Sequence, residues 1–142
     1  VQTGSSTNFT WDGLIDAKMT LKAGYWPRAR WLFHRDGIKL IRKLADSNNQ
    51  YLWQPATAAG EPDLILGVPY FISEYVPSTF TTGLYVGIIG DFSFYHIAQA
   101  RAVGIQRLVE LYAATNQVGF IGRREVDGMP VLEEAFVRCI TN

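Results

Sequence analysis

Two stretches of the chain repeat apolar residues at the spacing of an amphipathic helix. The first is expected to run from Thr10, a residue suited to cap a helix, to Gly24, a residue suited to end one. The second is expected to begin with Asp36 as its cap and to place Ile38 and Ile41 on one face. The pattern therefore predicts two short helices in the first third of the chain.

Shorter runs of apolar, aromatic and β-branched residues predict strands in the rest of the chain. Near the end, Asp127-Gly128 is a strong signal for a tight hairpin turn, which would require a positive φ at Gly128. Because strands and helices do not alternate strictly, the fold class is α+β, not doubly wound α/β. The predicted strands span residues 29–33, 68–75, 84–89, 94–100, 105–112, 117–126 and 135–140.

Composition narrows the class of protein. The chain has 142 residues, of which 48% are hydrophobic, 13% aromatic and 18% charged, so a disordered chain is excluded. Thirteen basic and thirteen acidic side chains give no overall positive field, which disfavours a general nucleic-acid binder. The longest uncharged stretch, residues 75–90, contains Pro77 and several glycines and threonines, which argues against a membrane helix. Residues 1–10 are polar and do not resemble a secretory signal. The start at Val1 rather than Met suggests a fragment or a processed product.

The charges are unevenly distributed along the sequence. Residues 1–43 carry eight basic and three acidic side chains, a net charge of +5, and the remaining 99 residues carry five basic and ten acidic side chains, a net charge of −5. The simplest interpretation is two solvated faces. A second interpretation is self-complementarity, in which the basic face of one subunit meets the acidic face of the next.

The search for catalytic chemistry finds little. His34-Arg35-Asp36 begins like a kinase catalytic loop, but Ile41 stands where the loop requires asparagine. His34 and His96 are too isolated for a metal centre, the single Cys139 is expected in the core, and Asp91 is best explained as a turn-forming residue. Gly119–Gly122 resembles a nucleic-acid-clamping loop but falls within a strand-like run. We therefore expect no enzyme, no cofactor and no metal site.

A series of short motifs points to a family. In chain order these motifs are Trp11–Ala17, Ala29–Phe33, Ile41–Asp46 with Tyr51–Pro55, Leu64–Pro69, Gly90–Ser93 with Tyr95–Ile97, and Arg123–Gly128 with Glu134–Phe136. Their order resembles the C-terminal part of the major capsid proteins of tailed bacteriophages. The resemblance implies the capsid-protein fold, a mixed sheet with flanking helices and a strand-rich peripheral portion.

The resemblance also implies a division of the chain into domains. Residues 1–27 would form a linker and a helix of the peripheral domain, residues 28–102 the axial domain, and residues 103–142 a strand-rich part of the peripheral domain. The partners would be other copies of the protein, arranged in pentamers and hexamers. The shell would enclose phage DNA without sequence-specific contacts, would not involve a membrane, and would be assembled in the cytoplasm of the bacterial host. The candidate subunit interface is the basic segment with Arg28, Arg30, Arg35, Lys39, Arg42 and Lys43.

Two other functions remain open from the sequence. An encapsulin-like cargo shell shares the architecture, and a small α+β enzyme or ligand-binding domain could use Asp91, Arg101 and the aromatic loops. The family's N-terminal arm, extended loop and spine helix have no counterpart in residues 1–142, so the chain looks like half of a capsid protein. We expect it to fold but not to build a shell on its own.

Overall fold

The computed structural model describes residues 1–5, 8–52 and 64–141 of the chain. These residues form two compact units: Val1–Phe94 together with Leu132–Asn142, and Tyr95–Val131. The motif Tyr51–Pro55 lies partly outside the described residues, and Tyr51 forms an isolated bridge with Ala45. The division into these two units does not identify an axial or a peripheral domain. The predicted domain boundaries therefore stay predictions.

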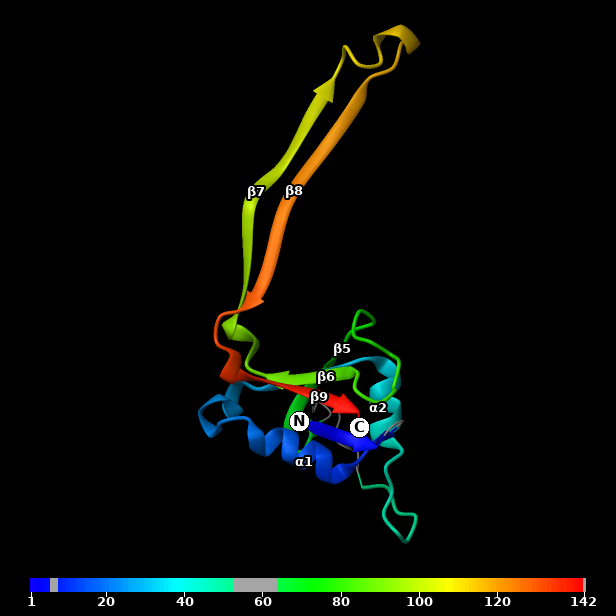
Figure 1. Cartoon of the computed structure of the whole chain (residues 1–142), viewed down its shortest axis with the longest axis vertical. Helices are drawn as coiled ribbons and strands as arrows, with labels where there is room; N and C mark the ends of the chain where they lie inside the picture. Colours follow the sequence, from blue (N-terminus) through cyan, green and yellow to red (C-terminus); the bar gives the residue numbers. More distant parts are fainter. Residues whose placement is uncertain (6–7, 53–63, 142) are drawn as a thin grey trace, which may run out of the picture. The chain divides into compact units, whose positions relative to one another are not determined.

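The first unit is built on a mixed sheet, which confirms the predicted α+β class. Among the described residues the sheet has seven strands in the order β2-β1-β9-β6-β3-β5-β4. The pairs β1–β9 and β3–β5 are parallel and the other pairs are antiparallel, so the first and last strands of the chain lie side by side (Figure 1). The strands are β1 (Gln2–Ser5), β2 (Asn8–Phe9), β3 (Arg30–Phe33), β4 (Leu64–Ile65), β5 (Val68–Ile72), β6 (Tyr85–Gly90) and β9 (Phe136–Thr141).

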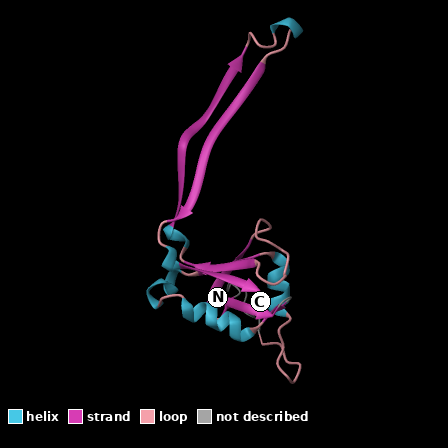
Figure 2. Ribbon diagram, viewed as in Figure 1, coloured by secondary structure: helices cyan, strands magenta, loops and turns pink. Residues whose placement is uncertain are grey.

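Helix α1 (Trp11–Thr20) packs against β1 and β9 (Figure 2). Its predicted cap is confirmed, since the Thr10 hydroxyl accepts a hydrogen bond from the Gly13 amide at 3.2 Å. The predicted end at Gly24 is wrong. Leu21 already has an extended backbone, because its side chain turns into the core, and a 3₁₀ helix, η1 (Ala23–Arg28), follows.

Helix α2 (Arg35–Arg42) begins two residues earlier than the sequence predicts. Its cap is His34 and not Asp36, because the imidazole of His34 accepts the amide hydrogen of Asp36. Asp36 instead sits in the first turn, where a carboxylate interacts favourably with the helix dipole. As predicted, Ile38 and Ile41 are buried on one face of the helix.

The core of the first unit is organised around the aromatic side chains of β3. Trp31 and Phe33 point to the same side of the strand and are stacked, with ring centroids 5.4 Å apart and an angle of 19°. Phe9 meets Phe33 edge to face at 5.5 Å. The indole Nε1 of Trp31 donates to the carbonyl oxygen of Ile65 at 3.1 Å, so the one polar atom of this buried ring is satisfied.

Gly87 on β6 leaves the space that the ring of Phe33 occupies. The two residues are cross-strand partners in the β3–β6 ladder. A β-carbon at Gly87 would overlap the Phe33 ring and would approach the carbonyl oxygen of Leu32 to 3.0 Å. The ring is fully buried in the core, where side chains are closely packed. Glycine is therefore required at this position by close packing.

Asp91 follows strand β6 directly and organises the turn there. Its carboxylate Oδ1 accepts hydrogen bonds from the Ser93 amide at 3.0 Å and the Ser93 hydroxyl at 2.7 Å, and its amide donates to the Ala135 carbonyl oxygen. Burial raises the pKa of Asp91, but the bonds from Ser93 and the nearby Arg28 and Arg30 lower it more, so the pKa lies below its ordinary value of 3.8. The structure supports the interpretation of Asp91 as a turn-forming residue.

The second unit is a long antiparallel hairpin of β7 (Tyr95–Leu108) and β8 (Gly119–Pro130). The sequence predicted two strands where β7 is continuous, with irregular register between Gln99 and Gly104. No side chain of either strand is fully buried. A 3₁₀ turn, η3 (Ala113–Thr115), lies between the strands.

The predicted hairpin turn at Asp127-Gly128 is wrong. Both residues lie inside β8, where Asp127 pairs with Ala98 and Gly128 pairs with Ile97. The backbone of Gly128 is outside the left-handed region, and the chain instead reverses between residues 109 and 118. The local preference of an Asp-Gly pair is overridden here by a ladder that continues on both sides of it.

The packing at Gly87 leads to a first prediction. Replacing Gly87 with alanine should lower the free energy of unfolding by about 1–3 kcal/mol, because the added methyl group overpacks the buried Phe33 ring. The matched control is Gly122→Ala on β8, where the new methyl group meets no atom within 4 Å. Urea denaturation of both variants measures the difference, and equal midpoints would contradict the account of the core.

The lowered pKa of Asp91 leads to a second prediction. A carboxyl whose pKa is lower in the folded state stabilises the fold above its ordinary value of 3.8, and this contribution disappears as the pH falls through the folded-state pKa. Asp91→Asn should therefore lose less stability than the parent chain between pH 6 and pH 3. Denaturant midpoints at the two pH values test this, and the same acid sensitivity in both proteins would refute it.

Candidate subunit-contact site

Four of the basic residues predicted as a subunit interface are brought together by α2. Arg35, Lys39 and Arg42 are spaced four and three residues apart, so they share one side of the helix, and all three are exposed. Lys43 follows as the C-cap and is also exposed. We call Arg35, Lys39, Arg42 and Lys43 the basic stripe. It lies on a helix whose other side is packed in the core.

The other two predicted residues lie on different elements. Arg28 ends η1, and its Nε lies 3.8 Å from Oδ2 of Asp91. Arg30 begins β3, is half-buried, and donates from Nη1 to the carbonyl oxygen of Ala29 at 3.0 Å. Both therefore make contacts within the chain.

Two members of the basic stripe also make contacts within the chain. Arg42 Nη2 donates to the hydroxyl of Tyr70 at 3.1 Å, and Arg35 Nε lies 3.7 Å from Oε1 of Glu74. These are exposed contacts, which stabilise a fold by only about 0–1 kcal/mol each. They connect Arg42 to β5 and Arg35 to the segment that follows β5.

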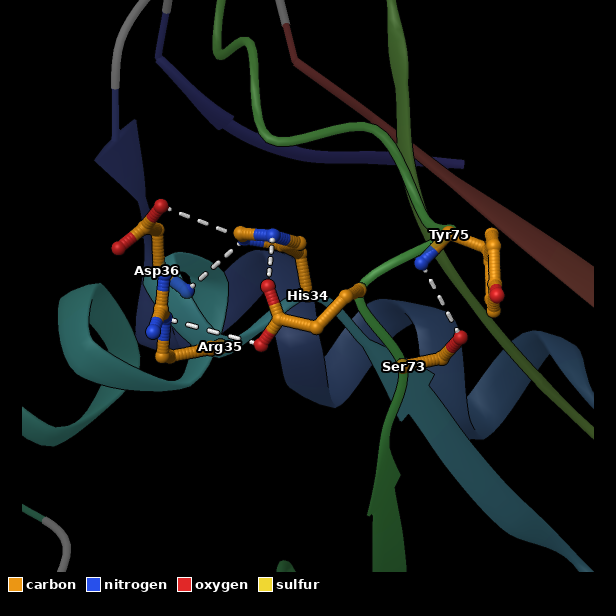
Figure 3. Close-up of polar contacts among 6 residues, drawn as sticks. His34, Arg35, Asp36, Ser73 and Tyr75 are labelled. Carbon is orange, nitrogen blue, oxygen red and sulfur yellow. Dashed lines mark hydrogen bonds and ion pairs between the residues drawn. The ribbon is translucent and has the colours of Figure 1, made fainter.

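His34 joins the start of α2 to the segment that follows β5 (Figure 3). Nδ1 of its imidazole accepts the amide hydrogen of Asp36 at 3.1 Å and lies 3.3 Å from the Asp36 carboxylate Oδ2. Nε2 lies 3.0 Å from Oε2 of Glu74, which also faces Arg35. The His34 side chain is only 8% exposed, so its polar atoms depend on these partners.

The segment that Glu74 anchors is tightly turned. The hydroxyl of Ser73 accepts a hydrogen bond from the amide of Tyr75 at 3.3 Å, and the amide of Ser73 donates to the carbonyl oxygen of Phe33. Tyr75 is fully exposed, and Figure 3 shows its side chain directed away from His34. His34 and Glu74 are 40 residues apart in the sequence, and no local pattern indicated that they meet.

A second polar cluster connects the segment after α1 to the segment before β9. Glu134 accepts a hydrogen bond from the Tyr25 hydroxyl at 2.9 Å and pairs with the ammonium group of Lys22. The hydrogen bonds from Lys22 and Tyr25 hold the pKa of Glu134 below its ordinary value, and the same contacts raise the pKa of Lys22 and of Tyr25. All three groups are exposed or half-exposed, so this cluster serves as a surface link between distant parts of the chain.

The other residues considered as candidates for chemistry are Cys139 and His96. Burial raises the pKa of the Cys139 thiol to about 12, so the thiol stays protonated and is a poor nucleophile, in agreement with its predicted place in the core. His96 is exposed on β7.

Within residues 1–5, 8–52 and 64–141, no three His, Cys, Asp or Glu side chains are grouped to hold a metal ion. In the same residues, no helix has the length and apolar character to cross a membrane.

Solved capsid structures share this fold. The chain is 27% identical to a capsid chain of an empty GTA particle computed with C5 symmetry, with a TM-score of 0.81 over 99% of this chain and 49% of that chain. The match to the native GTA capsid has the same identity, a TM-score of 0.78, and covers 99% and 53% of the two chains. A chain of Gordonia phage Cozz is 16% identical, with a TM-score of 0.69 over 100% and 49%, and supports the fold alone.

The chain thus spans about half the length of the capsid chains that it matches. A comparison with curated protein sequences found no match. The α+β fold predicted from the sequence, with its mixed sheet, is confirmed as that of phage capsid proteins. The profile of the phage capsid family matches residues 1–139, almost the whole sequence, and this protein therefore belongs to the phage capsid family.

Proposed function

We propose that this chain is part of a structural protein that assembles with copies of itself into the icosahedral head shell of a tailed phage or prophage. The observation that carries the proposal is the match to the GTA capsid chain, with a TM-score of 0.81 over 99% of the residues. A capsid protein functions through its contacts with other copies and needs no catalytic centre. The uses of Asp91 in a turn and of Cys139 in the core are consistent with a protein that is not an enzyme.

The location and partners follow from the same proposal. The protein resides in the virion capsid and is assembled in the cytoplasm of the bacterial host. Its partners are other copies in pentamers and hexamers, and the shell encloses DNA without reading its sequence. In this arrangement residues 28–102 belong to the axial domain, and residues 103–142, together with the first helix, belong to the peripheral domain.

The basic stripe is the part of the proposed interface that the structure supports best. Its four cations are exposed on one helix, while the chain after residue 43 has a net charge of −5. A helix fixed by its buried side can present charges in a constant geometry to an acidic surface of a neighbouring copy. Each exposed ion pair contributes only about 0–1 kcal/mol, so the effect must be collective and sensitive to salt.

A cargo shell of the encapsulin type is the second candidate function. It is favoured by the same fold, because such shells share the architecture of phage capsids. The contents of purified particles separate the two functions, since a head shell would contain DNA and a cargo shell would contain protein.

The shell and its basic interface lead to a third prediction. The complete gene product that carries this chain, expressed alone, should form closed particles visible by electron microscopy. The double variant Lys39→Glu/Lys43→Glu should form fewer particles, most clearly at low ionic strength, because reversed charges repel the acidic surface within a Debye length of about 10 Å at 0.1 M salt. Lys39 and Lys43 are chosen because, within the described part of the chain, neither forms an ion pair.

The control is the variant Lys39→Gln/Lys43→Gln, which removes the charges without reversing them and should give an intermediate yield. Equal particle yields for all three proteins at every salt concentration would contradict the basic interface. The absence of closed particles from the unmodified protein would contradict the shell function itself.

A further inference from the structure

The partners of His34 include a complete set for the neutral imidazole. A neutral imidazole has one nitrogen that donates and one that accepts. Nδ1 faces the amide hydrogen of Asp36 at 3.1 Å and must therefore be the acceptor. Nε2 faces Oε2 of Glu74 at 3.0 Å and must therefore carry the hydrogen. The neutral imidazole caps α2 with one nitrogen and holds the segment after β5 with the other.

The same site offers a complete set of partners to the protonated imidazole. The carboxylate Oδ2 of Asp36 lies 3.3 Å from Nδ1, close enough to accept a hydrogen from that atom. Glu74 remains the partner of Nε2, and Arg35 lies 3.7 Å from its second oxygen. Among the described residues, the charged groups around the imidazole are thus Asp36 and Arg35 on α2 and Glu74 after β5 (Figure 3).

The two states cannot coexist. A hydrogen on Nδ1 would point at the amide hydrogen of Asp36, so the helix cap is lost when the imidazole is protonated, while an ion pair with the Asp36 carboxylate is gained. The exchange needs no movement of the His34 ring, since both partners already lie within reach of Nδ1.

We propose that His34 is a proton-linked switch between two hydrogen-bond patterns at the first turn of α2. When His34 is neutral, Nδ1 caps the helix through the Asp36 amide. When it is protonated, the imidazolium bridges the Asp36 and Glu74 carboxylates and the cap is open. Imidazole is the side chain whose unperturbed change of charge falls between about pH 5 and pH 8.

The switch acts on the part of the fold that carries the basic stripe. Arg35 is the first residue of α2, and it shares Glu74 with His34. A change in the hydrogen bonds at the first turn of α2 therefore affects the position of Arg35 and of the segment that contains Glu74 and Tyr75. The effect on assembly rests on the proposed function, whereas the switch itself does not and is measured on the 142-residue chain.

The experiment is an NMR titration of the ¹⁵N-labelled chain from pH 8 to pH 5. At pH 8 the hydrogen of His34 should reside on Nε2. As His34 becomes protonated, the exchange protection of the Asp36 amide, corrected for intrinsic rates, should fall about fivefold, which corresponds to the ~1 kcal/mol of a typical N-cap. The shift of the Asp36 amide should follow the same midpoint as the imidazole.

Three variants make the test specific. His34→Asn keeps a capping oxygen that does not titrate, so its Asp36 amide should not respond to pH. His96→Asn removes the other histidine, on β7, and should leave the response intact. Glu74→Gln keeps an acceptor for Nε2 but removes one of the two carboxylates that the imidazolium would bridge, so the response of the Asp36 amide should be weaker between pH 8 and pH 5. A hydrogen on Nδ1 at pH 8, or an Asp36 amide that does not follow the titration of His34, would overturn the proposal.

Discussion

The packing of Phe33 against the backbone of Gly87 is the constraint on which the first unit depends. The two residues are partners in the ladder between β3 and β6, and the ring occupies the volume that any side chain at Gly87 would fill. Trp31 stacks on the same ring, and Phe9 meets its edge. One close approach between two central strands thus fixes the register of the sheet and the position of three aromatic side chains.

That constraint extends directly to the candidate contact site. Phe33 is the last residue of β3, and the next residue, His34, caps α2. The amide of Ser73 donates to the Phe33 carbonyl oxygen, so the segment that displays Glu74 and Tyr75 is tied to the same point. The basic stripe and its neighbouring segment are therefore anchored through Phe33, a fully buried residue of the core. A contact surface anchored in this way loses little conformational entropy on association.

The sequence allowed the elements with local signals to be predicted. The cap at Thr10, the buried face of α2 and the central strands follow from side-chain spacing and capping chemistry, which act over a few residues. The prediction of a turn at Asp127-Gly128 failed because a continuous β-ladder outweighs the turn preference of the dipeptide. That ladder depends on pairing with β7, about thirty residues earlier in the chain.

The contacts within the site could not be predicted from the sequence, for the same reason. His34 meets Glu74 across 40 residues, and Glu134 meets Tyr25 across 109. Only the folded sheet brings these pairs together, and no periodicity encodes them. The segregation of charge did indicate that basic residues would gather, and α2 brings four of the six together.

The stability of the described chain resides in the sheet around Phe33, since a two-stranded hairpin without buried side chains is only marginally stable. Native-state hydrogen exchange of the 142-residue chain tests this most directly. Amides of β3, β6 and β9 should exchange slowest, at the rate of global unfolding, and amides of β7 and β8 much faster. Exchange in β7 and β8 as slow as in β6 would contradict the account.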